Sequence, residues 1–541
     1  MRSSAHAAPR EGHLTVTSPA DGRTLGEVPI TPLPEVAAAA ERAARAFADW
    51  RRTPLETRLG RLRRLRRALI QHRHEIAELV ALEQGKPLTE ALLLELIPAL
   101  DTLSYLIHHA PRLAESPAAP PHNPFFQGRR AHYRFKPYGP WAVITPWNYP
   151  FAIPFVQLIS LAITGNVALL KPSPYTPLTA QKIAQLFQEA GFPPNWVQLI
   201  QGGAAQAEAL ITHPEVRGVL FTGSSATGRK VMALAAQGPK KVLLELGGKD
   251  AAIVLDDVNL ELSARGIAWA ATMNAGQTCA AIERVYVQER IYPGFTERLQ
   301  AELEALRVGH PLAPGVDVGP LIAPFQVEKV ARLVEAARAQ GGQVRTGGRR
   351  LEALGPHYYA PTLVANPPAE TPFMCEEAFG PVVGVVPVRD EVEAVRAVNA
   401  SPYGLTASLW TQSSRRAQAL APQLDVGVVT VNHHADTYAE AAGAWGGVKG
   451  SGFGRTHGPF GLLELVQLQY ISEAYPRAPA LWWYPYTERL HRVIDATLIL
   501  VGEPGLSRKL LAAVRLFPHL GYLARRLPLH RVLPALLRYA R

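Results

Sequence analysis

The sequence of 541 residues is poor in cysteine, with only Cys279 and Cys375. Two thiols cannot build a disulfide framework, and structural zinc sites usually take several cysteines, so we expect neither. His433 and His434 with Asp436 lack a further spaced ligand, and we predict no metal site. The scarcity of cysteine favours a reducing, cytoplasmic location.

Long apolar runs are also missing. The sequence has no stretch of 18 residues that are all apolar and uncharged, which argues against a transmembrane helix. The first residues, MRSSAHAAPREGHLTV, lack the apolar core of a secretory signal, so we expect none. No internal repeat of about 20–50 residues is evident, which excludes a solenoid.

Charge is unevenly distributed. Hydrophobic residues make up 48% and charged residues 19%, which is the composition of a globular protein and not of a disordered one. The net charge is +11, but residues 476–541 contain eleven Lys/Arg and three Asp/Glu, a net of +8. The other 475 residues therefore carry only +3. Electrostatic attraction to an anionic partner belongs to residues 476–541, and we predict no nucleic-acid partner.

The order of the expected elements indicates an α/β fold. Residues 33–115 repeat apolar side chains at helical spacing, and a Pro-rich break follows near residue 116. Beyond it, short apolar strands alternate with helices, which predicts a parallel sheet. The strands are expected at residues 141–145, 167–171, 197–202, 218–223, 240–248 and 251–256, with a helix at 179–191. Residues 116–137 predict a hairpin or extended arm, and residues 463–472 an alternating strand.

Common nucleotide-binding fingerprints do not fit. Residues 223–228, GSSATG, come close to a phosphate-binding loop, but Arg229-Lys230-Val231 follows where that motif needs Lys and then Ser or Thr. The dinucleotide pattern GxGxxG is also absent after this strand. A cofactor site must therefore rest on another pattern.

An ordered series of motifs supplies that pattern. A lone cysteine is usually a small core residue, and it becomes a nucleophile only where its thiolate is stabilised and accessible. Cys279, however, belongs to a series in fixed order. The series consists of WAVITPWNYP (141–150), LLKPSPYTP (169–177), FTGSSATG (221–228), VLLELGGKD (242–250), MNAGQTCAAIERVYV (273–287), EEAFGPV (376–382) and GGVKGSGFGR (446–455). This series resembles the aldehyde dehydrogenase superfamily over roughly residues 15–472.

The resemblance implies a covalent mechanism. Cys279 matches the nucleophile that attacks the aldehyde carbon, and the Asn148 amide with the Cys279 backbone N–H would stabilise the oxyanion. Glu245 matches the base that activates water to hydrolyse the thioester. A salt-bridged or capping carboxylate is the structural alternative for Glu245.

The resemblance also implies an NAD or NADP site. Its expected residues are Thr145, Pro146, Trp147, Lys171, Ser173, Gly223, Ser224, Glu377 and Phe379. One departure is Pro174, where many members have a Glu that binds the adenine ribose and favours NAD. Since Pro cannot repel a 2′-phosphate, and Lys171 and Arg229 could attract one, we expect NADP to be accepted, alone or beside NAD.

The expected substrate residues are without charge. They are Tyr149, Ile153, Val156, Thr278 and Trp445. Because no Arg or Lys is evident for a substrate carboxylate, we predict an apolar aliphatic or aromatic aldehyde. The alternative is that loop residues outside these motifs line the substrate tunnel.

The predicted organisation is a Rossmann-like cofactor-binding domain, a second α/β catalytic domain and a small β oligomerisation arm. The boundaries are 1–115 with 138–245 for the first, 246–435 for the second, and 116–137 with 436–475 for the arm and closing segment. Strand exchange through the arm would bury exposed edges, and the resemblance implies a homodimer or homotetramer.

Residues 476–541 extend beyond the usual family end. They alternate Leu-rich and aromatic positions with Arg, and Pro518, Pro528 and Pro534 interrupt them, which predicts short amphipathic helices. One interpretation is peripheral contact with an anionic membrane. The other is packing against the same subunit or a partner, because Arg stems also cover apolar surface.

Three other functions compete with aldehyde oxidation to the acid. A CoA-acylating relative would pass the thioester to CoA, which the presence of Glu245 disfavours. A non-catalytic protein with the same fold is disfavoured by the intact Cys279, Glu245, Asn148 and Lys171. The third is a membrane-surface binding protein that acts through residues 476–541.

Overall fold

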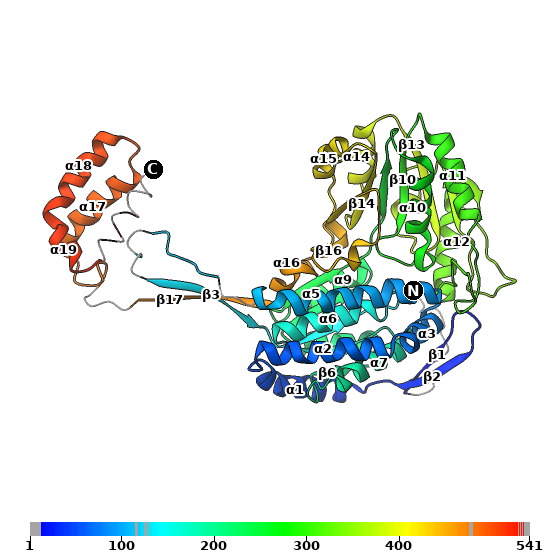
Figure 1. Cartoon of the computed structure of the whole chain (residues 1–541), viewed down its shortest axis with the longest axis horizontal. Helices are drawn as coiled ribbons and strands as arrows, with labels where there is room; N and C mark the ends of the chain where they lie inside the picture. Colours follow the sequence, from blue (N-terminus) through cyan, green and yellow to red (C-terminus); the bar gives the residue numbers. More distant parts are fainter. Residues whose placement is uncertain are drawn as a thin grey trace. The chain divides into compact units, whose positions relative to one another are not determined.

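The computed structural model describes residues 12–113, 117–123, 126, 129–474, 480–527, 530, 532 and 534. The chain forms two units, Met1–Leu113 with Pro137–Val466, and Ala114–Lys136 with Gln467–Arg541 (Figure 1). All the predicted catalytic, cofactor and substrate residues lie in the first unit. The second contains most of the predicted arm and of the strand predicted at 463–472, together with the C-terminal helices.

A six-stranded sheet forms the first half of the first unit. Its order is β16-β8-β7-β4-β5-β6, and all pairs are parallel except β16 with β8. The strands are β4 (Pro140–Ile144), β5 (Val167–Lys171), β6 (Val197–Leu199), β7 (Gly218–Thr222), β8 (Lys241–Glu245) and β16 (Gly452–Phe453). A separate hairpin pairs β1 (His13–Thr17) with β2 (Thr24–Pro29).

The helices of this half come mainly from the predicted helical region. They are α1 (Leu33–Trp50), α2 (Leu55–Gln71), α3 (Arg73–Gln84), α4 (Leu88–Glu90), the π-helix η1 (Ala91–Leu96), α5 (Ile97–Leu113), α6 (Ala152–Thr164), α7 (Pro177–Glu189), α8 (Ala204–Thr212), α9 (Ser225–Ala235) and α16 (Gly458–Glu464). Helix α6 is apolar around most of its circumference, and eleven of its thirteen residues are buried.

A seven-stranded sheet forms the second half. Its order is β11-β12-β13-β10-β9-β14-β15, and β11 alone is antiparallel to its neighbour. The strands are β9 (Asp250–Val254), β10 (Ile282–Gln288), β11 (Gln343–Thr346), β12 (Thr362–Ala365), β13 (Val382–Val388), β14 (Thr406–Trp410) and β15 (Val428–Val431). The two sheets of parallel strands confirm the predicted α/β class.

Helices cover both faces of the seven-stranded sheet. They are α10 (Leu260–Thr272), the 3₁₀ turn η3 (Met273–Gly276), α11 (Tyr292–Glu304), α12 (Pro324–Ala339), α13 (Pro372–Cys375), α14 (Glu391–Asn399) and α15 (Ser414–Leu420) (Figure 1). Successive residues of β9 point to opposite faces. Ala251 and Ile253 join the core beneath α12 and α14, whereas Ala252 and Val254 join the core beneath α10 and α11.

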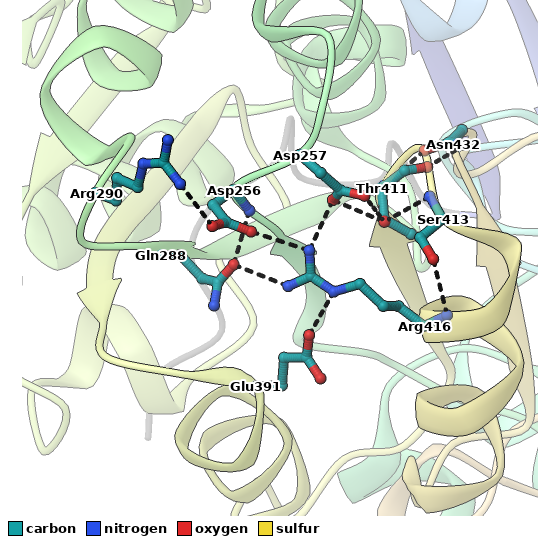
Figure 2. A network of polar contacts seen from close by, with 9 residues as sticks. All are labelled: Asp256, Asp257, Gln288, Arg290, Glu391, Thr411, Ser413, Arg416 and Asn432. Atoms are coloured by element: carbon teal, nitrogen blue, oxygen red, sulfur yellow. Dashed lines mark hydrogen bonds and ion pairs between the residues drawn. The ribbon is translucent and has the colours of Figure 1, made fainter.

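A polar network ties together the carboxyl ends of this sheet (Figure 2). The guanidinium of Arg416 on α15 pairs with Asp256, Asp257 and Glu391 at N–O distances of 2.9, 3.0 and 2.5 Å. Asp256 and Asp257 follow β9, and Gln288, which also accepts from Arg416, ends β10. Because Cys279 lies before the amino end of β10, this network belongs to the opposite end of the sheet from the predicted nucleophile.

The second unit pairs β3 (Arg130–Pro137) with β17 (Val466–Glu473). The predicted strand 463–472 therefore starts later than expected, because its first two residues end α16. The structure also divides the predicted closing segment 436–475: Gly452–Phe453 pairs with β8, whereas β17 pairs with the arm. Helices α17 (Glu488–Gly502), α18 (Leu506–Leu516) and α19 (Leu520–Ala524) follow in the same unit.

One helical stretch of the first unit, Leu88–Pro111, is long and apolar enough to cross a membrane by length and composition. Half of its most apolar window is buried within the protein, and the core helix of a globular protein meets the same criterion.

Candidate active site

Several predicted cofactor residues and the predicted base Glu245 lie at one edge of the six-stranded sheet. Thr145, Lys171, Gly223 and Glu245 each lie at or directly after the carboxyl end of β4, β5, β7 or β8. These four strands are parallel, so their carboxyl ends share one edge, where ligands of open α/β sheets bind. Pro146, Trp147, Ser173 and Ser224 follow in the adjoining loops.

Lys171 has the environment expected of a residue that binds a polar ligand. Its side chain is buried, and Nζ donates to Pro172 O at 2.8 Å. An ammonium has three donors, so this bond leaves capacity for hydroxyl or phosphate oxygens. Burial lowers the pKa of Lys171 to about 8. The neighbouring Ser173 is also buried, and its Oγ accepts from Tyr175 N at 3.3 Å.

The amino end of α9 supplies an anion-binding position at the same edge. Ser224 is the N-cap, and its Oγ accepts from Thr227 N at 3.3 Å. Gly223 N donates to Glu245 O at 3.0 Å and holds this turn against β8. The helix dipole and the N–H groups of a first turn favour phosphate. Together with Lys171, this arrangement fits NAD or NADP.

Phe379 and Glu377 come from the other half of the first unit, just before β13. The ring of Trp147 lies 5.4 Å from the ring of Phe379, edge to face. Glu377 Oε1 accepts from Gly248 N at 3.0 Å, and a Cβ at Gly247 would lie 2.6 Å from the Glu377 carboxylate. Burial raises the pKa of Glu377 to about 7. Gly247 therefore lets this carboxylate approach the turn after β8.

A left-handed turn positions Cys279. Asn274, Ala275 and Gly276 have φ of 54°, 53° and 68°, a region that Gly and Asn tolerate best. A Cβ at Gly276 would lie 2.1 Å from Gly380 O, so no other residue fits there without displacing the backbone. Asn274 N donates to both oxygens of the buried Glu90, at 3.1 and 2.9 Å.

Asn148 is hydrogen-bonded to this turn. Its Nδ2 donates to Gln277 O at 3.0 Å, which leaves its second N–H for another acceptor. Its backbone O accepts from Asn274 Nδ2 at 2.9 Å, and the hydroxyls of Tyr149 and Thr278 are 2.7 Å apart. The structure thus brings Asn148 and Cys279 together, although 131 positions separate them in the sequence.

Cys279 and Glu245 line the same cavity, whose volume is about 170 Å³. The five predicted substrate residues, Tyr149, Ile153, Val156, Thr278 and Trp445, also line it. The sequence-based prediction missed further wall residues, which include Leu93, Leu94, Ile97, Pro98, Trp269 and Tyr438. Those from η1 and α5 lie in a helical apolar pattern, which gives no signal that separates a cavity wall from a core.

Burial controls the protonation of both reactive groups. It raises the pKa of Glu245 to about 8, although Thr456 Oγ1 donates to Oε1 at 3.2 Å. Oε2 of Glu245 is buried and has no hydrogen-bond partner among the described residues. Burial, and then the carboxylates of Asp250, Glu245 and Glu377, raise the pKa of the Cys279 thiol. At neutral pH the thiol therefore needs a proton acceptor before it can attack.

The buried pair Lys86–Glu95 supports the Asn148 side of the site, and sequence reasoning missed it. Lys86 Nζ donates to Glu95 Oε1 at 2.6 Å and to Asn148 O at 2.9 Å. Glu95 Oε2 accepts from Phe151 N at 3.1 Å and from Ala152 N at 2.6 Å, which fixes the start of α6. Both side chains are completely buried.

A second buried pair, Lys249–Glu283, supports the Phe379 side. Lys249 Nζ forms a hydrogen-bonded ion pair with Glu283. Glu283 Oε1 accepts from the backbone N–H groups of Ala378 and Phe379, both at 2.9 Å. This pair therefore holds the backbone that carries Phe379.

The fold and the site define a class: a two-sheet α/β oxidoreductase with a cysteine and a buried glutamate in one cavity beside a nucleotide-binding sheet edge. The aldehyde dehydrogenase family model matches residues 6–471, and the chain belongs to that family. It is accordingly an NAD(P)-dependent aldehyde dehydrogenase.

Known proteins agree with this assignment. The chain is 37% identical over 484 residues to the 4,4'-diapolycopene aldehyde oxidase of Methylomonas sp, covering 88% of each chain. It is 35% identical to the mitochondrial succinate-semialdehyde dehydrogenase of Oryza sativa subsp. japonica, covering 85% of this chain and 86% of the relative. Its structure is similar to that of an E. coli NADP-dependent enzyme, with a TM-score of 0.82, 33% identity, and coverage of 86% and 95%.

Proposed function

We propose that this enzyme oxidises an apolar aldehyde to the carboxylic acid through a thioester on Cys279. The observation that carries the proposal is the composition of the cavity around Cys279 and Glu245. Its wall is mainly apolar and contains no Lys or Arg among the described residues. Such a wall disfavours a second, anionic group on the substrate, because that charge would lose its hydration and find no Lys or Arg as a partner among the described lining residues.

The first step forms a carbon–sulfur bond. Glu245, as a carboxylate, accepts the thiol proton directly or through water, and Cys279 Sγ attacks the aldehyde carbon. The carbonyl π electrons move to oxygen, where the free N–H of Asn148 Nδ2 and the Cys279 backbone N–H stabilise the negative charge. One such donor is worth about 10²–10³ in rate. The bond from Asn148 to Gln277 O orients this amide before substrate arrives.

The next steps release the acid. Bound NAD(P) would supply the acceptor for the hydride that leaves the aldehyde-derived carbon, and that carbon would remain on Cys279 as a thioester. The thiol proton passes from Glu245 to solvent, and the restored carboxylate then takes a proton from water, whose oxygen attacks the thioester carbonyl. The carbon–sulfur bond breaks, the carboxylic acid leaves, and Glu245 returns the proton to the sulfur, which restores the Cys279 thiol. A carboxylate with a pKa raised to about 8 suits this role as a base near neutral pH.

The experiment is turnover of an aldehyde series, from acetaldehyde through the n-alkanals and benzaldehyde to succinate semialdehyde. Formation of reduced cofactor is followed with NAD and NADP for wild type and for Cys279→Ala. We expect apolar aldehydes to be preferred and the variant to be inactive. Preference for succinate semialdehyde would overturn the apolar assignment. Acyl-CoA formation on adding CoA would instead favour the CoA-acylating alternative.

For the cofactor, we infer that NADP is accepted. Pro174 follows Ser173 near the carboxyl end of β5 and carries no carboxylate that could repel a 2′-phosphate. Lys171 and Arg229 are the cations expected near such a group. A thousandfold preference for NAD in kcat/KM would contradict this inference.

The second unit supports two further proposals. The pair of strands β3 and β17 is the element through which we expect a homodimer or homotetramer to assemble, and sedimentation equilibrium measures the stoichiometry. The C-terminal helices have a core of their own, which includes Leu490, Val493 and Leu516. They therefore form a packed element and not a loose tail.

The C-terminal helices also expose large apolar side chains. Leu510 and Val514 on α18 and Phe517, its C-cap, recur at helical spacing and are 60%, 68% and 73% exposed. Arg508 and Arg515 lie on the same helix, in a segment with a net charge of +8. A two-fold contact between copies would oppose like charges, so we favour an anionic lipid surface, with the enzyme cytoplasmic and peripherally bound.

Flotation with phosphatidylglycerol vesicles tests this contact, with phosphatidylcholine vesicles as the uncharged comparison. Wild type should float with the anionic vesicles, and the double variant Val514→Asp, Phe517→Asp should not. Val392→Asp, at a side chain that is 65% exposed on α14, is the matched control. Equal flotation of all three proteins would refute the contact.

A further inference from the structure

A second apolar depression lies on the first unit, beside the cavity that contains Cys279. Its volume is about 310 Å³, and α2, the first residue of α3, α4, η1 and α5 form its wall. The lining residues are Leu69, Ile70, Arg73, Thr89, Leu92, Leu93, Leu96, Ile97 and Leu100. Arg73 is its one charged side chain among the described residues. We call this depression the η1 groove.

The η1 groove adjoins the catalytic cavity, and two wall residues are common to both. Leu93 and Ile97 line both spaces. Both are exposed, at 43% and 50%, so the two spaces meet at the protein surface. Leu92 lines only the groove and Leu94 only the cavity. The boundary between the two spaces therefore runs along η1.

The π-helical geometry of η1 is consistent with this arrangement. Residues Ala91–Leu96 form a π-helix within an otherwise α-helical stretch. A π-helix widens the turn locally and is frequent at functional sites. Here Leu92 lines the groove, Leu93 lies at the shared border, and Leu94 lines the cavity. Glu95 in the same segment is tied to Lys86, which fixes the segment beside Asn148.

From this shared, exposed border we infer that the η1 groove is a subsite for the hydrocarbon chain of a long-chain aldehyde. The aldehyde carbon would lie at Cys279, and the chain would pass Leu93 and Ile97 into the groove. The cavity of about 170 Å³ would hold the reactive end, and the larger groove would hold the distal methylene groups. The inference rests on the proposed function and narrows its substrate class.

Burial of methylene groups predicts how the enzyme responds to chain length. Each fully buried methylene favours binding by up to about fourfold. In wild type, kcat/KM should therefore continue to rise beyond the length that fills the cavity alone. A short aldehyde such as hexanal should depend little on the groove, whereas dodecanal should depend on it strongly.

Two variants disturb the groove by different means. Ile70→Asp places a carboxylate at a groove side chain that is 43% exposed, and Thr89→Trp fills the groove from another exposed position. Neither residue lines the cavity, so both variants should keep hexanal turnover within about twofold of wild type. We expect kcat/KM for dodecanal to fall about tenfold in each, the effect of losing a few buried methylenes. Val392→Asp is the control for an added surface charge.

The outcomes distinguish failure of the groove subsite from failure of the proposed aldehyde oxidation. Unchanged dodecanal turnover in both Ile70→Asp and Thr89→Trp would overturn the groove subsite while hexanal oxidation upheld the proposed function. Failure of folded wild type to oxidise hexanal or dodecanal would overturn the proposed function and the subsite with it. Loss of hexanal and dodecanal turnover by the same factor would also count against the subsite, because a distal site must discriminate by length.

Discussion

Two buried lysine–glutamate pairs support the active site from opposite sides, and they differ in what they hold. Lys86–Glu95 binds the backbone of Asn148 and the start of α6, on the aldehyde side. Lys249–Glu283 binds the backbone N–H groups of Ala378 and Phe379, on the cofactor side. Each pair fixes a loop whose own side chains are needed for other contacts.

The difference suggests how the enzyme divides its tasks. Burying an ion pair carries a large desolvation penalty, so such pairs are poor sources of net stability but strong local constraints. Here one constraint acts on the expected oxyanion donor and the other on the residue expected beside the nicotinamide. Variants on the aldehyde side should therefore change kcat, and variants on the cofactor side should change the KM for NAD(P).

The largest expected effect is on the aldehyde side alone. Replacing Cys279 by Ala removes the nucleophile, and we expect turnover to fall by at least about 10³-fold. Binding of the cofactor, measured by fluorescence titration, should be unchanged. Cys375→Ala, at an exposed thiol, is the control and should keep full activity. Residual activity near the wild-type level in Cys279→Ala would refute the covalent mechanism.

Glu245→Gln, also on the aldehyde side, should distinguish formation of the thioester from its hydrolysis. Gln cannot accept a proton from water, so steady-state turnover should fall about 10²–10³-fold. A stoichiometric burst of reduced cofactor would persist only if a group other than Glu245, such as solvent, is the final acceptor of the thiol proton. The burst is measured by stopped-flow absorbance. A proportional loss of burst and steady state would mean that Glu245 acts before thioester hydrolysis.

The pH profile gives the same residue an independent test. Because burial raises the pKa of Glu245 to about 8, the carboxylate that acts as base is formed as pH rises through that value. Wild-type kcat should therefore increase between about pH 7 and 9. The pH dependence of stability has the opposite sign. The folded state binds the Glu245 proton more tightly than the unfolded state does, so the free energy of unfolding falls as pH rises from 4.5 to about 8.

The two pairs themselves provide the direct comparison. Lys86→Met and Lys249→Met each leave a buried carboxylate unpaired, and each should lower the free energy of unfolding by about 3–5 kcal/mol. Among molecules that stay folded, Lys86→Met should lower kcat, and Lys249→Met should raise the KM for the cofactor. Thermal unfolding and steady-state kinetics measure the two effects. Identical kinetic changes in both variants would remove the proposed division.

The smallest expected effect concerns only the cofactor side. Pro174→Glu places a carboxylate after Ser173, where it would repel a 2′-phosphate. We expect kcat/KM for NADP to fall about tenfold relative to NAD, with the aldehyde KM unchanged. Pro174→Gln has a similar size without the charge and should leave the ratio near that of wild type.

Much of this architecture could be predicted from the sequence because its signals are local. The strand VALLK ends at Lys171 and the strand GVLFT ends directly before Gly223, so strand periodicity and motif position agree. The left-handed turn before Cys279 is marked by Asn274 and Gly276. These features depend on neighbouring residues and on nothing distant.

The features that the sequence did not predict depend on contacts between residues that are distant in the chain. Glu95 and Lys86 resemble ordinary helix charges, and only the folded chain shows that both are completely buried. Leu93 and Ile97 fit an amphipathic helix equally well as core residues, as surface residues or as cavity walls. The residues of α16 that begin the predicted strand 463–472 also fit either structure, since a short apolar run does not distinguish helix from strand.

The pairing of β16 with β8 has a consequence for synthesis of the protein. Gly452 lies opposite Glu245 in an antiparallel register, and Thr456 donates to the Glu245 carboxylate. Translation proceeds from the amino end, so Cys279 leaves the ribosome long before these residues exist. The base acquires its final surroundings only when more than four fifths of the chain has been made. The newly made thiol therefore spends most of its time on the ribosome without the enclosure that later restrains its chemistry.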